Sequence, residues 1–336
     1  MSLILDGSNS VTFPDGTVQT TTAKTGMVNR IINGGMSIWQ RGTSITGSVA
    51  SSSASYWADR WCFYRGANAS AITLSQQTSG GATNFQYYAR IQRTASNTSI
   101  DSLSLNQSAE IFNSFDLAGN SVTLSFWARA GANYSATSNK LGYVVTTGTG
   151  TVDNNSLWNS WTGATNILSS DVILTTSWQR FSVTANVGST VTQISAGFQI
   201  NLTGTAGAAD YVDITGVQLE KGSTATSFDY RPYGTELALC QRYFQTVSDR
   251  SNTKGSYYSI TAGRLSGNLA PPMRSAPTTT LAGTSYEYVG IGSVTGTNGA
   301  VSSTTTGYYF DATSLSGGVY SAQLMYLGQI SLSAEL

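Results

Sequence analysis

Apolar and polar residues alternate along much of the first two thirds of the chain. Between residues 194 and 202, Ile, Ala, Phe, Ile and Leu occupy every second position, with Ser, Gly, Gln and Asn between them. A period of two places successive side chains on opposite faces of a strand, so that one face is buried and the other is solvated. The same alternation recurs in segments 86–92, 122–127 and 180–187. It predicts an antiparallel β-sandwich or barrel spanning residues 29–233.

A change of phase marks the end of this region. Val212 and Ile214 share one strand parity, whereas Val217 and Leu219 share the opposite parity. Gly216 lies where the phase changes. A strand that keeps both pairs on its buried face needs one extra residue, and glycine tolerates the backbone that such a residue adopts. The pattern therefore predicts a β-bulge at Gly216.

Residues 234–245 are the one segment with a convincing helical period. Leu237, Cys240 and Phe244 follow the i, i+3, i+7 spacing of a buried helical stripe. Thr235 is a plausible N-cap, because its hydroxyl can accept a hydrogen bond from an unpaired backbone N–H of the first turn. We therefore expect a linking helix over 234–245, with Phe244 on its buried face.

Residues 246–336 predict a small C-terminal β-sandwich, rich in tyrosine on a Gly, Ser and Thr background. Two tyrosine doublets, Tyr257-Tyr258 and Tyr308-Tyr309, lie in predicted strands. Because neighbouring residues of a strand point to opposite faces, one tyrosine of each doublet should face out. Tyrosine is a rigid, amphipathic contact residue, which makes this unit a candidate recognition surface.

Residues 1–28 predict a separate unit of short strands joined by Asp-Gly turns. Its few apolar residues cannot form a core alone. The segment must therefore associate with copies of itself or with a partner, or else remain a flexible tail.

Charge and composition exclude several classes of function. Lysine plus arginine and aspartate plus glutamate number 17 each, so the net charge is zero, and charged residues are only 10% of the chain. Nucleic-acid binding and polybasic membrane contact both need an excess of basic residues. No apolar run reaches the ~20 residues that span a bilayer. The first residues, MSLILDGSNS, lack the basic and then apolar layout of a signal peptide, so we expect synthesis in a cytosol.

The chain contains no histidine. This removes imidazole bases, Ser-His-Asp triads and His-ligated metals. The two cysteines, Cys62 and Cys240, cannot form a disulfide framework, and we expect free thiols packed as small hydrophobes rather than a bridge.

The carboxylates are scattered and form no recognisable pair of the kind that glycosidases use. We interpret Asp59 as a partner of Arg60 or a turn cap, and Glu220 as equally structural. No glycine-rich phosphate loop opens a helix. The sequence therefore predicts no enzyme, no cofactor and no metal.

Several motifs in one order resemble a known group of proteins. Residues 216–245, GVQLEKGSTATSFDYRPYGTELALCQRYFQ, are similar to a stretch found in virion proteins of tailed bacteriophages, mostly tail fibres. RIINGGMSIWQRGTS (30–44), YWADRW (56–61), VTLSFWARA (122–130) and MRSAPTTT (273–280) occur in the same order in that group. The opening VTFPDGTVQTTTA (11–23) is similar to a common N-terminal motif of phage fibres.

The resemblance implies an all-β virion protein, with an N-terminal β-hairpin anchor and a jelly roll similar to a carbohydrate-binding module. It further implies a homo-oligomer, with a trimer expected. The N-terminus would join another tail or baseplate protein, and the ligand would be a host surface polysaccharide. The candidate attachment residues are Leu5, Phe13, Asp15, Gly16 and Val18. Two alternatives are a structural head, neck or tail decoration protein and a glycan-degrading tailspike, although no long β-helix repeat is present.

Aromatic side chains are the candidate glycan contacts, because an aromatic face matches the apolar face of a pyranose. In the sandwich they are Trp127, Trp158, Trp161 and Trp178, of which Trp158 and Trp161 lie in a predicted loop, where exposed aromatics more often bind ligands. In residues 246–336 they are Tyr258, Tyr308 and Tyr309. We expect host recognition in this C-terminal unit, with the loop tryptophans as the competing location.

Overall fold

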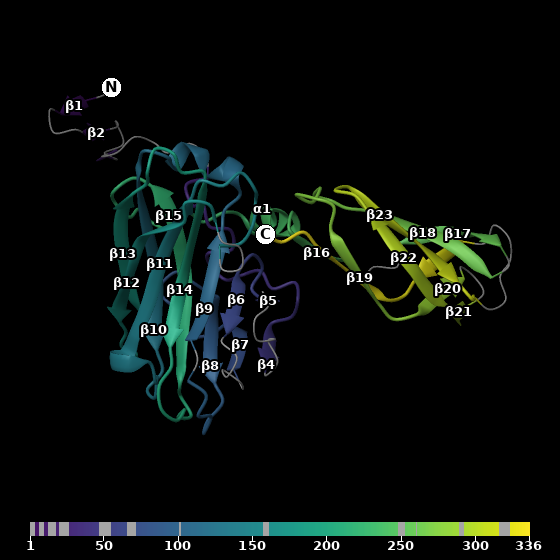
Figure 1. Ribbon diagram of the computed structural model, residues 1–336, viewed down its shortest axis with the longest axis horizontal. Helices are drawn as coiled ribbons and strands as arrows, with labels where there is room; N and C mark the ends of the chain where they lie inside the picture. Colours follow the sequence, from purple (N-terminus) through teal and green to yellow (C-terminus); the bar gives the residue numbers. More distant parts are fainter. Residues whose placement is uncertain are drawn as a thin grey trace.

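The protein forms three β units in chain order (Figure 1). The computed structural model describes residues 4–6, 10–12, 18–19, 27–46, 55–65, 72–100, 102–156, 161–247, 253–259, 261–288, 292–315 and 323–336. The first unit is a three-stranded antiparallel sheet of β1 (Ile4–Asp6), β2 (Ser10–Thr12) and β3 (Val18–Gln19). These are the short N-terminal strands that the Asp-Gly turns predicted.

The second unit is a sandwich of two six-stranded antiparallel sheets. Sheet I has the order β13 (Gln179–Asn186), β10 (Ser121–Ala130), β15 (Tyr211–Lys221), β8 (Tyr88–Arg93), β7 (Ile72–Gln77), β4 (Ser44–Thr46). Sheet II has the order β12 (Thr165–Ile173), β11 (Lys140–Gly148), β14 (Gln193–Asn201), β9 (Ser102–Ser108), β6 (Cys62–Arg65), β5 (Ser55–Tyr56). Short 3-10 turns occupy Ile111–Asn113, Phe115–Leu117 and Thr137–Asn139. The predicted β-sandwich is confirmed.

The core lies between the two sheets, and the alternating pattern identified its members. Leu124 and Phe126 point inward from sheet I, and Phe198 and Ile200 point inward from sheet II. The rings of Phe126 and Phe198 meet edge to face, with centroids 4.8 Å apart. Each fully buried side chain of this size contributes roughly 1.5–3 kcal/mol through removal from water.

The predicted β-bulge is present. Ser125 of β10 pairs with Gln218, and Trp127 pairs with Thr215, so that two residues of β15 oppose one residue of β10. Gly216 lies in this bulge with φ +60°. The four residues on either side of the phase change, Val212, Ile214, Val217 and Leu219, are consequently all buried in one core.

The third unit, here called the distal unit, has its own core and two sheets. The smaller sheet has the order β16 (Phe244–Val247), β25 (Gln329–Ser333), β19 (Thr278–Ala282). The larger has the order β21 (Gly292–Thr295), β20 (Ser285–Tyr288), β24 (Gln323–Tyr326), β17 (Lys254–Ser259), β18 (Ala262–Asn268), β23 (Gly307–Thr313), β22 (Thr297–Ser303). The predicted small C-terminal sandwich is therefore confirmed.

The linking helix is shorter than the sequence predicted. Helix α1 spans Tyr233–Gln241 and begins after Pro232, so that Thr235 is not its N-cap. Cys240 is its buried residue, but Phe244 is not on the helix at all, because it begins strand β16. Phe244 pairs with Ser333 of β25. Pairing with a strand near the far end of the chain overrides the local helical spacing.

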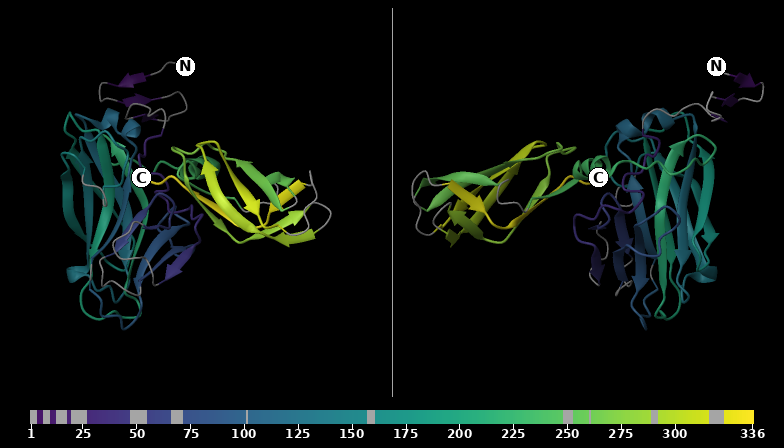
Figure 2. Two further views of the ribbon diagram at one scale, coloured as in Figure 1. Left: turned by 45° about the vertical axis from the view of Figure 1, so that its right-hand side comes forward. Right: turned by 180° about the vertical axis from the view of Figure 1, so that it is seen from behind.

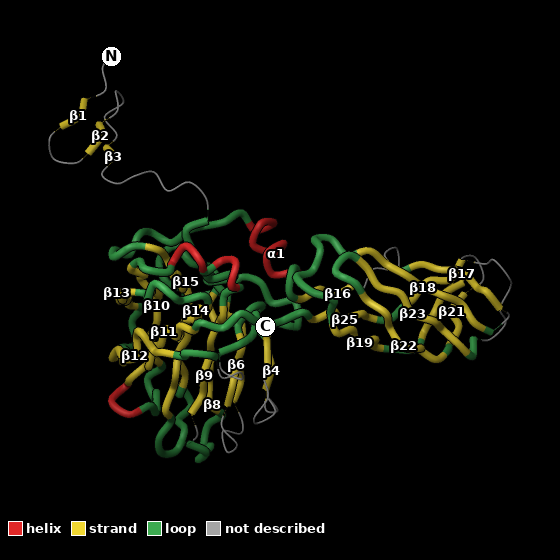
Figure 3. The backbone as a smooth tube through the Cα atoms, turned by 45° about the horizontal axis from the view of Figure 1, so that its top comes forward, coloured by secondary structure: helices red, strands yellow, loops and turns green. Residues whose placement is uncertain are grey.

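The distal unit leaves and rejoins the sandwich at one place, next to α1 (Figures 1 and 3). Residues that follow β25 return to the sandwich: the guanidinium of Arg60 lies 2.6 Å from the carboxylate of Glu335, and Arg41 lies 3.0 Å from it. The Tyr56 hydroxyl donates to the Leu336 carbonyl oxygen at 2.6 Å. Views from other sides show the same arrangement (Figure 2).

The two carboxylates that the sequence marked as structural are both buried. Glu220 accepts hydrogen bonds from the backbone N–H and hydroxyl of Thr226 at 2.8 and 2.7 Å, as a turn cap does. Asp59 does not pair with Arg60 but with Arg41, 3.3 Å away. Burial, opposed by Arg41, raises the pKa of Asp59 to about 7.

Cys62 and Cys240 are both buried and are not bridged to each other, as expected. None of the helices in the described part of the chain has the length and apolarity that a bilayer crossing requires. Within the same residues, no group of three or more His, Cys, Asp and Glu side chains could hold a metal ion.

Candidate functional site

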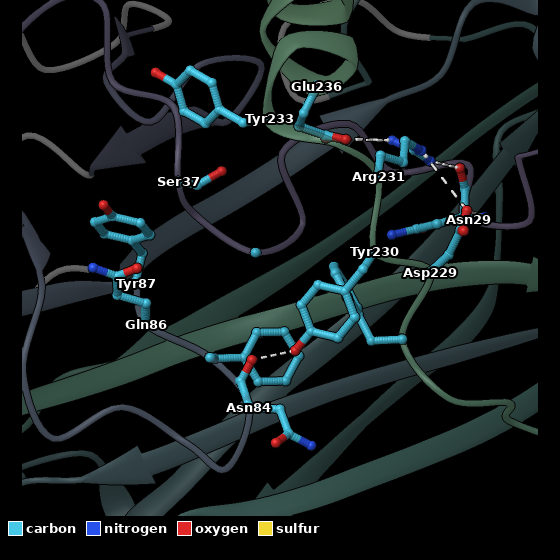
Figure 4. A pocket seen from close by; sticks show the side chains of 13 residues that line it. Asn29, Ser37, Asn84, Gln86, Tyr87, Asp229, Tyr230, Arg231, Tyr233 and Glu236 are labelled. Atoms are coloured by element: carbon cyan, nitrogen blue, oxygen red, sulfur yellow. Dashed lines mark hydrogen bonds and ion pairs between the residues drawn. The ribbon is translucent and has the colours of Figure 1, made fainter.

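An aromatic hollow of about 320 Å³ opens beside sheet I (Figure 4). Three segments form it: the loop before β8, the segment that runs from β15 into the first turn of α1, and the stretch that leads into the sandwich from the N-terminal side. Its lining residues are Asn29, Gly35, Ser37, Asn84, Phe85, Gln86, Tyr87, Phe228, Asp229, Tyr230, Arg231, Tyr233 and Glu236.

Three rings form one wall of the aromatic hollow. Phe85, Phe228 and Tyr230 contact one another with centroid separations of 4.9 to 5.5 Å. The Tyr230 hydroxyl donates to the Asn84 carbonyl oxygen, which ties the two sides of the hollow together. Tyr230 remains 57% exposed and Tyr233 63% exposed. Aromatic side chains that are large, exposed and held in place by their neighbours can contact a ligand, and they do not belong to the core.

The bulge at Gly216 makes room for this cluster. A Cβ atom at Gly216 would lie 2.5 Å from Cζ of Phe85. The absence of a side chain therefore lets the Phe85 ring rest on the backbone of β15. Gly216 therefore both keeps the apolar residues of β15 on the buried face and leaves space for the Phe85 ring of the aromatic wall.

An ion pair and several hydrogen bonds to the backbone hold the segment that carries these rings. Arg231, with only 6% of its side chain exposed, lies 3.1 Å from a carboxylate oxygen of Glu236. It also donates to the carbonyl oxygens of Asn29 and Ile31. Asp229 accepts from the backbone N–H of Val28 at 2.9 Å and of Asn29 at 3.1 Å. These contacts fix the backbone on both sides of Tyr230, so the ring is positioned before any ligand arrives.

Polar side chains face the same space. Figure 4 shows Ser37, Asn84 and Gln86 around the opening. Asn84 and Gln86 are exposed. An amide side chain offers both donors and an acceptor, which suits the hydroxyl groups of a sugar. The aromatic hollow therefore combines an apolar ring face with neutral hydrogen-bonding groups.

A smaller hollow of about 200 Å³ continues from it across sheet I. The two share Asn84, Phe85, Phe228 and Tyr230. Trp127 and Arg180 line its far side. The aromatic hollow and this smaller hollow together form one extended surface over the outward side of sheet I.

A third hollow, of about 490 Å³, lies on the outward side of sheet II. Its lining is mainly polar and includes Asn106, Asn166 and Gln199. Asp171 at its edge is paired with Lys140, whose Nζ lies 2.9 Å away. This surface can donate and accept hydrogen bonds, but it lacks the exposed rings of the aromatic hollow.

The predicted loop tryptophan Trp161 is buried, at 6% exposure, and does not present its ring to solvent. Its indole N–H donates to the side-chain oxygen of Asn154 at 2.6 Å. The ring packs closely over Gly148, where an added Cβ would lie 3.0 Å from it. Trp161 thus supports its own loop, and the expectation of an exposed contact is wrong. Trp158 lies outside the described residues.

The tyrosine doublets alternate as predicted. Tyr258 and Tyr309 are 52% and 43% exposed, whereas Tyr257 and Tyr308 are each 4% exposed. Tyr308 is therefore corrected from a candidate contact to a core residue, and its hydroxyl lies 2.6 Å from that of Thr253. Arg264 lies over the Tyr309 ring at 4.8 Å. Tyr258 and Tyr309 remain candidates on the outward face of the larger distal sheet.

Two of the candidate attachment residues fall in described strands, Leu5 in β1 and Val18 in β3. Phe13, Asp15 and Gly16 lie outside the described residues.

The sequence pattern did not single out Phe228, Tyr230 and Tyr233 as candidate contacts. Phe85 and Tyr87 were not connected with them. The available signal was the density of aromatic residues around Pro232, but the partner loop that completes the hollow is distant in the sequence.

No family model and no curated protein matches this chain. Solved structures that are similar include "CBM4 structure and function", with 18% identity, a TM-score of 0.33 and coverage of 56% of this chain and 98% of that one. The enzymatically active domain of bacteriophage CBA120 tailspike protein 4 has 10% identity, a TM-score of 0.36 and coverage of 58% and 22%. The Stig cyclase Fisc from Fischerella sp. TAU has 11% identity, a TM-score of 0.36 and coverage of 60% and 100%. All these likenesses are distant, and the function of this chain must be argued from its own residues.

Proposed function

We propose that the protein is a non-enzymatic, glycan-binding fibre subunit of a bacteriophage particle. The observation that carries the glycan-binding part is the aromatic hollow, where the exposed rings of Tyr230 and Tyr233 stand beside neutral polar side chains. An aromatic face can stack on the apolar face of a pyranose while amide groups meet its hydroxyls. Each contact is weak, and several copies on one fibre raise the overall affinity.

The carboxylates around the aromatic hollow support a binding role rather than hydrolysis. Asp229 is engaged by two backbone N–H groups, and Glu236 is ion-paired with Arg231. A glycosidase needs two carboxyl groups that flank the scissile bond and are available for proton transfer or attack. Side chains that are already committed to holding the backbone suit a preformed binding site instead.

The virion part of the proposal rests on the sequence resemblance to phage fibres. Under this proposal, the N-terminal sheet attaches the subunit to another tail or baseplate protein. Copies of the chain associate with one another, and a trimer is expected. The glycan belongs to the host surface. Tyr258 and Tyr309 of the distal unit form a second candidate contact surface, because they are exposed on one sheet face beside Arg264.

Paired tyrosine substitutions in the full chain test where the glycan binds. Binding to a glycan array should weaken roughly thirty-fold in the Tyr230→Ala, Tyr233→Ala double variant, because a central aromatic anchor typically contributes about 2 kcal/mol or more. The comparison variant is Tyr258→Ala with Tyr309→Ala, which removes the two rings of the second candidate contact surface. Thermal unfolding of both variants checks that the sandwich still folds.

The two variants and the parent chain separate three outcomes. Loss of glycan binding in the Tyr230→Ala, Tyr233→Ala variant alone would support the aromatic hollow as the binding site. Loss of glycan binding in the Tyr258→Ala, Tyr309→Ala variant alone would place the glycan on the distal unit. If the parent chain binds no glycan at all, the protein is a structural decoration and the glycan-binding proposal is wrong.

A further inference from the structure

A row of charged side chains crosses the outward face of sheet I. Arg129 of β10 pairs in register with Asp213 of β15, and Asp213 pairs in register with Arg90 of β8. Residues directly opposite each other on neighbouring strands place their side chains on the same face. The three side chains therefore stand side by side, with the carboxylate between two guanidinium groups.

One carboxylate serves both arginines. Asp213 is fully buried and accepts from Nε and Nη2 of Arg90 at 2.7 and 2.9 Å, and from Nε of Arg129 at 2.8 Å. No other carboxylate of the described residues forms an ion pair with either arginine. The row consequently carries an excess of one positive charge, and the side chains of Arg90 and Arg129 are 18% and 19% exposed.

Aromatic rings fix the orientation of both guanidinium groups. Arg90 lies 3.6 Å from the centroid of the Tyr211 ring, and Arg129 lies 4.8 Å from that of Trp178. The Tyr88 hydroxyl accepts from Nη2 of Arg129 at 3.2 Å. Nη1 of each arginine forms no hydrogen bond within the described part of the chain. A planar guanidinium held on a ring loses little entropy when a carboxylate binds to its free edge.

This row adjoins the surface described above. Trp127, which lines the smaller hollow, lies two residues before Arg129 on the same strand and therefore on the same face. Arg180 is the cross-strand partner of Trp127. The outward face of sheet I thus combines ring faces for sugar stacking with three arginines and two buried carboxylates, Asp213 and Glu220.

We propose that Arg90 and Arg129 form a subsite for a sugar that bears a carboxylate, so that the glycan bound by this protein is an acidic polysaccharide. This inference rests on the proposed function, because it assumes that the sugar chain runs over the outward face of sheet I. The free edges of the two guanidinium groups bind the carboxylate, and the neighbouring rings bind the pyranose.

The experiment measures binding of the full chain to three acidic polymers, each paired with its fully methyl-esterified form. Polygalacturonate, hyaluronate and polysialic acid distinguish uronic from sialic acids, and esterification removes the charge of each carboxylate while adding only a methyl group. We expect at least one acid to bind about ten-fold more tightly than its ester. Arg129→Gln should abolish that preference, and it leaves both Arg90 bonds to Asp213 intact.

Arg242→Gln is the matched control, because Arg242 also pairs with a carboxylate, that of Glu110, but does not line any of the hollows described above. It should leave the preference unchanged. The inference is overturned if no acid is preferred to its ester, or if the preference survives Arg129→Gln. If the proposed function itself is wrong, the result is different. The binding of the acids and of the esters is then unchanged in the Tyr230→Ala, Tyr233→Ala double variant.

Discussion

At the scale of single residues, Gly216 has two roles that no other residue type can combine. Its φ of +60° allows the extra residue in β15 that keeps the apolar residues on both sides of the bulge on the buried face. Because it has no side chain, the ring of Phe85 can pack against the backbone at this position. Gly216→Ala should lower stability by about 1–2 kcal/mol through the left-handed backbone alone. The clash with Phe85 adds to this cost and should also weaken glycan binding.

Gly204→Ala is the control for this prediction. Gly204 has a φ of +55°, but nothing lies within 4 Å of an added Cβ. Urea unfolding should show the larger loss for Gly216→Ala, and only that variant should bind glycan more weakly. Equal losses in stability with binding intact would mean that Phe85 is not seated by the glycine.

At the scale of elements, the junction between β16, β25 and the sandwich depends on a buried ion pair. The side chains of Arg60 and Glu335 are only 2% and 6% exposed. Glu335→Gln leaves the Arg60 charge without its partner, and breaking a buried pair in this way costs about 3–5 kcal/mol. We expect a clear drop in the free energy of unfolding, measured in urea.

Asp311→Asn provides the comparison, because its partner Arg264 is largely exposed at 58%. Solvent screens such a pair, so the variant should unfold almost as the parent does. If Glu335→Gln is equally mild, the return of the chain to the sandwich is not held by this ion pair.

At the scale of the whole molecule, strands β1, β2 and β3 lie apart from the sandwich (Figure 3), in which Ile31 is the first of the described core residues. Deletion of residues 1–26 should therefore leave the melting temperature of the sandwich and its glycan binding unchanged. The shortened chain should fail to join phage particles, because it lacks the proposed attachment segment. Immunodetection in purified particles measures this, and normal incorporation would contradict an anchoring role.

The sequence alone was sufficient for the fold class, because a period of two is a local property of each strand. It identified the inward residues of β10 and β14, the bulge at Gly216 and the alternation of Tyr257 with Tyr258 and of Tyr308 with Tyr309. In the tyrosine doublets both neighbours are the same residue type, so the sequence could not decide which one faces the core, and Tyr308 was chosen as a contact although it is buried.

Only the tertiary structure decided the contacts between distant segments. Phe244 has helical spacing from Cys240, yet it joins a strand because β25 offers it a hydrogen-bonding partner. The aromatic hollow needs Phe85 and Tyr230 together, and the charged row needs Arg90, Arg129 and Asp213. Sequence periodicity reports the environment of one strand at a time, whereas these sites arise from the register between strands, which is set by long-range backbone pairing and shared burial.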